Sequence, residues 1–264
     1  MDIIIPMIDG RGQVDSLGIR GKAIECVALT AASVGKEAFS QYQQEVMNLI
    51  TALAEAELPP ADPRMQPLSK CWGNLSKILG EDLKPYFARI LPRLLEAAVR
   101  QPNIRMLAEY DPEDETGWQF LELDNQTKMG IESASVESRE AAFNMLYWVA
   151  SFNAKTIQPH ISQILPICMD SFNFVYNSGV RTASAGASCS ILKIISETEE
   201  LAAAARQIFQ RLVMALLNET DNEVYVTQLE YLLEVSKIVS RIGSVTECRS
   251  VSTWQYQISL LLKK

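Results

Sequence analysis

The chain has little of the chemistry on which most catalytic and metal sites depend. Its 264 residues contain one histidine, His160, so a catalytic triad or a multi-histidine metal site would need partners that the chain lacks. Gly21-Lys22 and Gly35-Lys36 lack the earlier glycine and the following hydroxyl residue of a Walker loop, and no dinucleotide fingerprint is present. We therefore expect no enzyme activity, no metal ion and no cofactor.

Paired cysteines and long apolar runs are also missing. None of the five cysteines forms a CxxC motif, which favours buried, reduced thiols: Cys26, Cys71, Cys168, Cys189 and Cys248. The start, MDIIIPMIDG, has Asp2 where a signal peptide needs cations, and no run approaches the roughly 18 apolar residues of a membrane span. These features predict a cytosolic or nuclear protein without membrane insertion. The apolar start also suggests a piece of a longer protein.

Cations are outnumbered, with 24 Lys and Arg against 32 Asp and Glu, and the net charge is -8. A chain this acidic repels phosphate backbones, so we do not expect direct binding of nucleic acid. Basic proteins or peptides are the partners that its field would attract.

Apolar residues recur at helical spacing along most of the chain and predict five antiparallel helix pairs. Ser16 is suited to cap the first helix, Gly35 to stop it, and Pro59 and Pro60 to end the second. No strand signal is apparent. The predicted helices are 16–34 and 40–56, 62–79 and 83–99, 135–152 and 157–172, 178–195 and 199–217, and 221–242 and 245–262.

The second helices contain an internal repeat. VGKEAFSQYQQEVMNL, LGEDLKPYFARILPRL and FNAKTIQPHISQILPI align without a gap, so that Phe39, Leu83 and Ile157 coincide, as do Tyr42, Tyr86 and His160. Arginines also recur near the starts of first helices, at Arg20, Arg139 and Arg181. A period of about 42 to 46 residues fits HEAT or armadillo repeats. We therefore predict an all-α HEAT-repeat α-solenoid that forms a single domain over residues 1–264.

Residues 101–134 interrupt the repeat between the second and third pairs. This acidic insert gathers many carboxylates around two aromatic residues, and we interpret it as a long functional loop. An EF-hand reading is weak, because Pro112 and Thr116 break the calcium-loop pattern. Either the insert is merely solvated, or it contacts a basic partner or the solenoid, with the aromatics docked there. The candidate partner-binding residues are Glu109, Asp111, Glu113, Asp114, Glu115, Trp118, Phe120 and Glu122.

Further acids fall on the predicted second helices and would give an acidic floor to a concave face lined by those helices. They are Glu45, Glu55, Glu57, Glu96 and Asp170.

Two segments resemble a known family. RGKAIECVALTAASVGKEAF, residues 20–39, and ETGWQFLELDNQTKMGIESASVESREAAF, residues 115–143, are similar to the karyopherin-beta (importin-beta) nuclear transport receptors, in particular the importin beta-3 subgroup.

The resemblance implies a receptor that shuttles between cytoplasm and nucleus through the nuclear pore. Its expected partners are basic cargo proteins with lysine-rich import signals, GTP-bound Ran, and phenylalanine-glycine nucleoporins. The acidic residues fit lysine-rich signals. The alternative function is a HEAT-repeat scaffold for the assembly of protein complexes.

Overall fold

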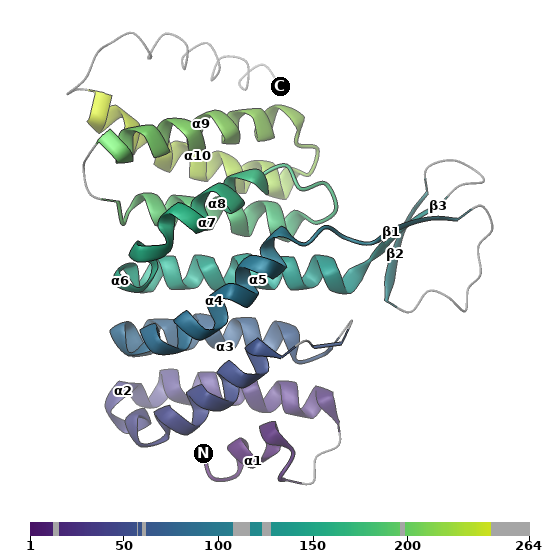
Figure 1. Ribbon diagram of the computed structural model, residues 1–264, viewed down its shortest axis with the longest axis vertical. Helices are drawn as coiled ribbons and strands as arrows, with labels where there is room; N and C mark the ends of the chain where they lie inside the picture. Colours follow the sequence, from purple (N-terminus) through teal and green to yellow (C-terminus); the bar gives the residue numbers. More distant parts are fainter. Residues whose placement is uncertain are drawn as a thin grey trace. The chain divides into compact units, whose positions relative to one another are not determined.

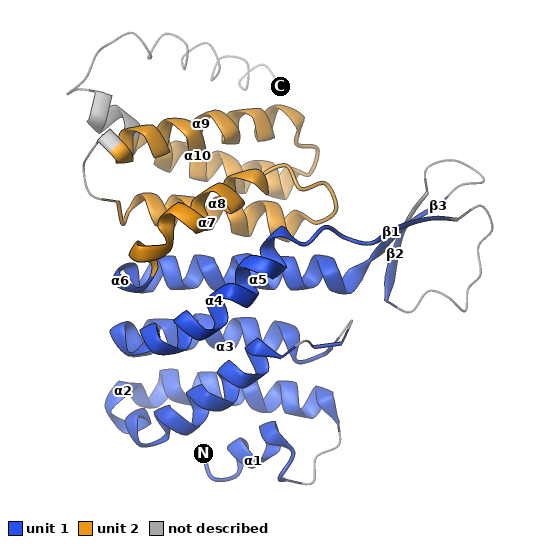
Figure 2. Cartoon of the chain, in the orientation of Figure 1, with its two compact units in different colours: residues 1–156 blue, residues 157–264 orange. Residues whose placement is uncertain are grey.

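The computed structural model describes residues 1–12, 16–56, 58–59, 62–107, 117–122, 128–195 and 199–243 (Figure 1). Contacts within the chain define two compact units, residues 1–156 and 157–264, which Figure 2 distinguishes by colour. The two units are described separately below.

The first unit contains every helix predicted up to residue 152, and α1 precedes them. Its helices are α1 (Ile4–Asp9), α2 (Leu17–Glu55), α3 (Met65–Leu79), α4 (Lys84–Val99), α5 (Ser133–Phe152) and the start of α6 (Ala154–Ile157). Within α2, Gly35 has φ 78° and ψ 171°, so α2 is two helices that meet at this residue. The predicted stop at Gly35 is thereby confirmed. We call the first helix of each pair the A helix and the second the B helix.

In the first unit the A and B helices stack on those of the neighbouring pairs. α3 lies against α2 and α5, and α4 also contacts both of them, as the successive layers in Figure 1 show. Trp72 on α3 is fully buried. A Cβ atom at Gly73 would come within 2.8 Å of Trp148 on α5. The small residue therefore allows these two A helices to approach closely.

In the part of the second unit that the structure describes, a short 3-10 turn, Gln158–His160, is followed by four longer helices. Its helices are α7 (Ile161–Asp170), α8 (Ser178–Leu192), α9 (Glu199–Asn218) and α10 (Asn222–Gly243), and α8 contacts each of the other three. The predicted helix 245–262 lies outside the described residues. No helix in the described ranges is long and apolar enough to cross a membrane.

Side chains that the internal repeat aligns are buried to the same degree. Phe39, Leu83 and Ile157 are each 0% exposed, whereas Tyr42, Tyr86 and His160, three residues further on, are only half-buried. Equivalent positions therefore have equivalent environments. Residues seven positions after the first set are buried as well: Val46, Ile90 and Ile164.

Arginines near the starts of A helices bind the chain that precedes them. Arg139 donates from Nη1 to the Arg100 carbonyl, just after the end of α4, at 3.2 Å. Arg181 donates in the same way to the Phe174 carbonyl at 3.0 Å and forms two bonds with Glu219, at 2.7 and 3.1 Å. These buried arginines satisfy carbonyl groups at the turns between pairs.

The acidic insert begins and ends in strands, so the prediction that no segment forms a strand was wrong there. β1 (Ile104–Leu107), β2 (Trp118–Glu122) and β3 (Lys128–Glu132) form an antiparallel sheet in the order β1-β3-β2. Each strand has only four or five residues. An alternating pattern over so few positions is easily overlooked beside a run of acids.

Leu91→Ala should destabilise the chain by about 2 to 5 kcal/mol, because Leu91 on α4 is only 5% exposed and its loss leaves a cavity between layers. Urea denaturation followed by circular dichroism measures this change. Val99→Ala is the control, since Val99 on the same helix is 50% exposed and should cost less than about 0.5 kcal/mol. Equal effects of both substitutions would show that the buried face of α4 is misassigned.

Arg181→Leu should cost about 3 to 5 kcal/mol, because it leaves the Glu219 carboxylate, 6% exposed, without its guanidinium partner. Adding Glu219→Gln should recover part of the loss, since the amide removes the buried charge. The control is Arg211→Leu, which breaks the exposed pair with Asp170 and should cost less than about 1 kcal/mol. The same denaturation experiment measures all three, and a double variant no more stable than Arg181→Leu would contradict the role of the charge.

Candidate functional site

Strands β1, β2 and β3 form the stem of the acidic insert. An arginine on β1 contacts two aromatic rings on β2 and holds the strands together. The guanidinium carbon of Arg105 on β1 lies 4.1 Å from the ring centroid of Trp118 and 5.6 Å from that of Phe120, both on β2. Arg105 and Phe120 are both paired with Gly130 on the central strand, so their side chains share one face of the sheet. Such cation–π contacts contribute about 0.5 to 2 kcal/mol each.

Gly130 provides the space for this cluster. A Cβ atom at this position would lie 3.0 Å from both Arg105 Cγ and Phe120 Cε1. Even a methyl group there would force Arg105 or Phe120 to shift by a few tenths of an ångström, and a larger side chain by more, so glycine suits this packing.

The stem is also fastened to the start of α5. The Glu132 amide donates to the Asn103 carbonyl at 3.0 Å, and the Ser133 amide donates to the Gly117 carbonyl at 2.9 Å. The Asn103 side-chain amide donates to the Glu132 carboxylate at 2.6 Å. These bonds fasten the start of β1 and the start of β2 to the start of α5.

The structure brings together only part of the predicted site. Trp118 and Phe120 are alternate residues of β2, and the backbone of Glu122 pairs with Lys128. The side chain of Glu122 and the whole of residues 108–116, with the other five candidate acids and the EF-hand-like positions, lie outside the described residues. Docking of the two aromatics against a solenoid helix stays a prediction.

Sequence alone missed Arg105, the contact partner of both rings. The signal that could have found it is the alternation of Ile104, Arg105 and Met106 in a strand facing the Trp118–Phe120 alternation. Among the described residues, no group of three or more His, Cys, Asp or Glu is placed to hold a metal ion.

The acids on the B helices of the first unit already have arginine partners. Glu45 accepts from Arg11 at 3.3 Å, and Glu55 forms two bonds with Arg89 at 2.7 and 3.0 Å. Glu96 binds both Arg100 and Arg93, and these hydrogen bonds lower the pKa of its carboxyl group. In the second unit, Arg211 pairs with Asp170. The expected acidic floor is thus largely neutralised by the chain's own arginines where the structure describes it.

Gly130→Val should loosen the stem, because the added methyl groups displace Arg105 from Trp118 and Phe120. We expect amide hydrogens in 104–107 and 118–122 to exchange at least about tenfold faster, equivalent to 1.4 kcal/mol. Met129→Val is the control, since Met129 is the neighbouring strand residue and lies on the opposite face of the sheet. Unchanged exchange in the Gly130 variant would show that the cluster does not hold the strands together.

Comparisons with known proteins find relatives of the chain, although no family model matches it. Importin subunit beta-3 of Saccharomyces cerevisiae is 23% identical over 219 residues, which are 80% of this chain and 20% of that protein. A probable importin-5 homolog of Dictyostelium discoideum is 21% identical over 178 residues, 67% of this chain and 15% of that protein. The chain therefore spans a fifth or less of the length of these relatives.

Solved structures of the karyopherin Kap121p have the same fold. Kap121p alone matches all of this chain and 25% of its own with a TM-score of 0.76 and 20% identity. Kap121p bound to RanGTP matches 98% of this chain and 25% of its own with a TM-score of 0.73 and 20% identity. Kap121p has also been solved bound to Pho4p and to Nup53p. The predicted HEAT-repeat fold is confirmed by these likenesses.

Karyopherins are transport receptors and not enzymes, which agrees with the expectation of no catalytic activity. Together, the sequence relatives and the shared fold confirm the resemblance noted at residues 20–39 and 115–143. The chain is similar in sequence and in fold to a HEAT-repeat part of the karyopherins importin beta-3 and importin-5.

Proposed function

We propose that this chain is part of a nuclear import receptor that binds basic cargo proteins and carries them through the nuclear pore under the control of GTP-bound Ran. The observation that carries the proposal is the combined likeness in sequence and fold to importin subunit beta-3 and Kap121p. Kap121p structures with RanGTP, Pho4p and Nup53p support the choice of these partner classes. Such a receptor shuttles between cytoplasm and nucleus.

The acidic insert is the part of this chain that we propose for recognition of lysine-rich signals. Residues 108–116 include five acids and no lysine or arginine. A concentration of one charge attracts a basic segment and raises its rate of association. The insert is favoured over the B helices, because a lysine that approaches Glu45, Glu55 or Glu96 must compete with an arginine already bound there.

The stem gives this recognition a fixed base. Strands β1 and β2, on either side of the acidic segment, are held by the Arg105–Trp118–Phe120 cluster and by the bonds to the start of α5. In this proposal Trp118 and Phe120 support the binding residues, and the acids Glu109, Asp111, Glu113, Asp114, Glu115 and Glu122 contact the cargo.

The A-helix face offers a contact for phenylalanine-glycine nucleoporins. On α5, Trp148 stacks on Phe152 with ring centroids 5.9 Å apart, and Phe152 is 45% exposed. Exposed aromatic pairs favour further aromatic side chains, because they bury apolar area and stack edge-to-face or offset. We propose that nucleoporin phenylalanines contact this pair.

Titration of a fluorescent lysine-rich peptide against the chain should yield saturable binding that weakens with salt. Changing Glu113, Asp114 and Glu115 together to Gln, Asn and Gln should weaken binding about three- to 150-fold, because each exposed charge pair contributes about 0.2 to 1 kcal/mol. Fluorescence anisotropy at about 50 and 150 mM salt measures both effects.

The matched control is Glu200→Gln with Glu223→Gln and Glu230→Gln. These residues are exposed in the second unit, and the triple change alters the net charge equally but leaves the insert intact. Equal losses in both triple variants would assign binding to net charge and not to the insert. No binding by any form would contradict a cargo-binding role for this chain and favour the scaffold alternative.

A further inference from the structure

The outer edge of β1 carries main-chain groups that point away from the sheet. The Glu132 amide donates to the Asn103 carbonyl, so these two residues form a hydrogen-bonded pair. Such pairs alternate with pairs that share no hydrogen bond along an antiparallel ladder. Ile104 and Met106 therefore direct their N–H and C=O groups outward, whereas Arg105 directs its own toward β3.

This edge is open in the part of the chain that the structure describes. The sheet lies at the N-terminal end of α5, and its order β1-β3-β2 leaves β1 with a strand on one side only (Figure 1). The side chains of Ile104 and Met106 are 44% and 59% exposed. At the other edge, Trp118 and Phe120 are half-buried, so β1 is the more accessible strand. An exposed edge of this kind pairs readily with another extended segment.

The sheet face that meets this edge is apolar. Ile104 is paired with Ile131 and Met106 with Met129, so the four side chains share the face opposite to Arg105. Ile131 is only 2% exposed, so the apolar face is covered at the central strand and opens toward β1. Methionine adapts to apolar partners of different shape. A segment that pairs with β1 should therefore carry apolar side chains at two alternate positions.

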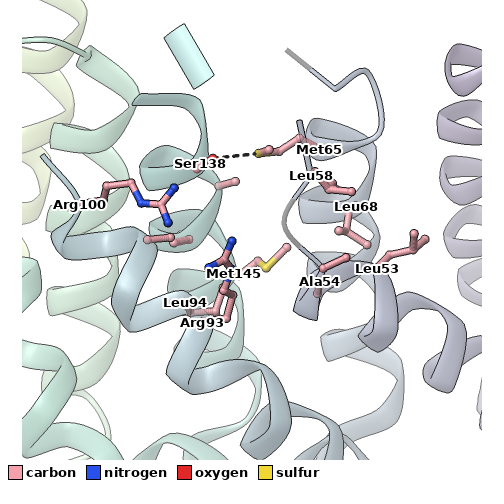
Figure 3. A pocket seen from close by; sticks show the side chains of 14 residues that line it. Leu53, Ala54, Leu58, Met65, Leu68, Arg93, Leu94, Arg100, Ser138 and Met145 are labelled. Carbon is pink, nitrogen blue, oxygen red and sulfur yellow. Dashed lines mark hydrogen bonds between the residues drawn. The ribbon is translucent and has the colours of Figure 1, made fainter. Parts of the chain in front are cut away.

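The helices of the first unit offer a smaller recess. Leu53, Leu68 and Met145 line a pocket where α2, α3, α4 and α5 meet (Figure 3). Its volume of about 90 Å³ is far below the roughly 300 to 1,000 Å³ of ligand sites. This pocket has no room for a segment of a partner, whereas the edge of β1 needs none.

We propose that β1 docks an extended segment of a basic partner protein as a fourth, antiparallel strand of the sheet. Two apolar residues of the partner, at positions i and i+2, pair with Met106 and Ile104 and exchange main-chain hydrogen bonds with them. The chain attracts a basic partner because its net charge is -8 and because residues 108–116, which follow β1, include five acids and no lysine or arginine. The inference rests on the proposed cargo role of the insert and adds that the cargo is held by its main chain.

The test is a titration of the whole chain with the fluorescein-labelled peptide Lys-Lys-Ser-Ile-Thr-Ile-Ser-Lys-Lys and two N-methylated forms of it, followed by fluorescence anisotropy. N-methylation of both isoleucines removes the N–H groups that face β1 and should weaken binding at least about fivefold. N-methylation of the threonine and the second serine is the control. It removes N–H groups that point away from β1, so the affinity should change less than about twofold.

Met106→Pro locates the docking strand. Proline lacks the N–H group, and at this position that group points away from β3, so β1 and β3 stay paired. We expect the unmethylated peptide to bind at least about fivefold more weakly. Met106→Ile is the matched control, because it keeps both the N–H group and an apolar side chain and should leave the affinity within about twofold. Amide exchange in 118–122 and 128–132 verifies that the stem is intact in each variant, and if Met106→Pro loosens it, the methylated peptides decide the outcome.

Equal affinity of all three peptides would overturn docking at β1, as would a loss confined to the methylated threonine and serine. If binding in either case still weakens when Glu113, Asp114 and Glu115 are neutralised, the proposed cargo role stands and strand addition alone is contradicted. Absence of binding by the unmethylated peptide at millimolar concentration would contradict both. Equal binding of a peptide with glutamates in place of the four lysines would overturn the choice of a basic partner.

Discussion

The constraint on which the fold depends is that one helix pair cannot bury its own apolar stripe. Phe39 and Leu83 occupy equivalent places in successive pairs and are both fully buried, because the neighbouring layer covers what each pair leaves open. The small residue Gly73 brings α3 and α5 close enough for Trp148 to pack against it. Stacking buries the apolar faces of the helices. The surfaces left for partners are therefore the polar helix faces, the turns and the insertions.

Arginine has three different roles in this arrangement. Buried arginines such as Arg139 bind carbonyl groups at the turns and hold the starts of A helices in place. Exposed ones such as Arg89 neutralise acids on B helices. Arg105 packs against the rings of Trp118 and Phe120. A net charge of -8 therefore describes the average of the chain, and the local charge of each surface depends on where these arginines lie.

The helices were predictable because they follow from local pattern. A period of 3.6 residues sustained over 15 to 20 positions is a strong signal, and the gapless repeat predicted that Tyr42, Tyr86 and His160 would share an environment. The sheet was not predictable in this way. Its strands are four or five residues long, and β1 pairs with β3 across residues 108–127, so the contact of Arg105 with Trp118 depends on a register that no local pattern encodes.

In the proposed function, the stem lets an acidic insert contribute to binding. A segment rich in like charges has too little apolar surface to fold alone, and any partner must supply the free energy that orders it. Fixing its two ends reduces the conformational entropy that binding must remove, because fewer arrangements are open to it beforehand. The contacts that hold the flanking strands are made by Arg105 and by the start of α5, and Gly130 leaves space for Arg105. None of these residues needs to contact the partner. Under the proposed function, the residues that determine affinity for a basic ligand therefore include a basic one, Arg105.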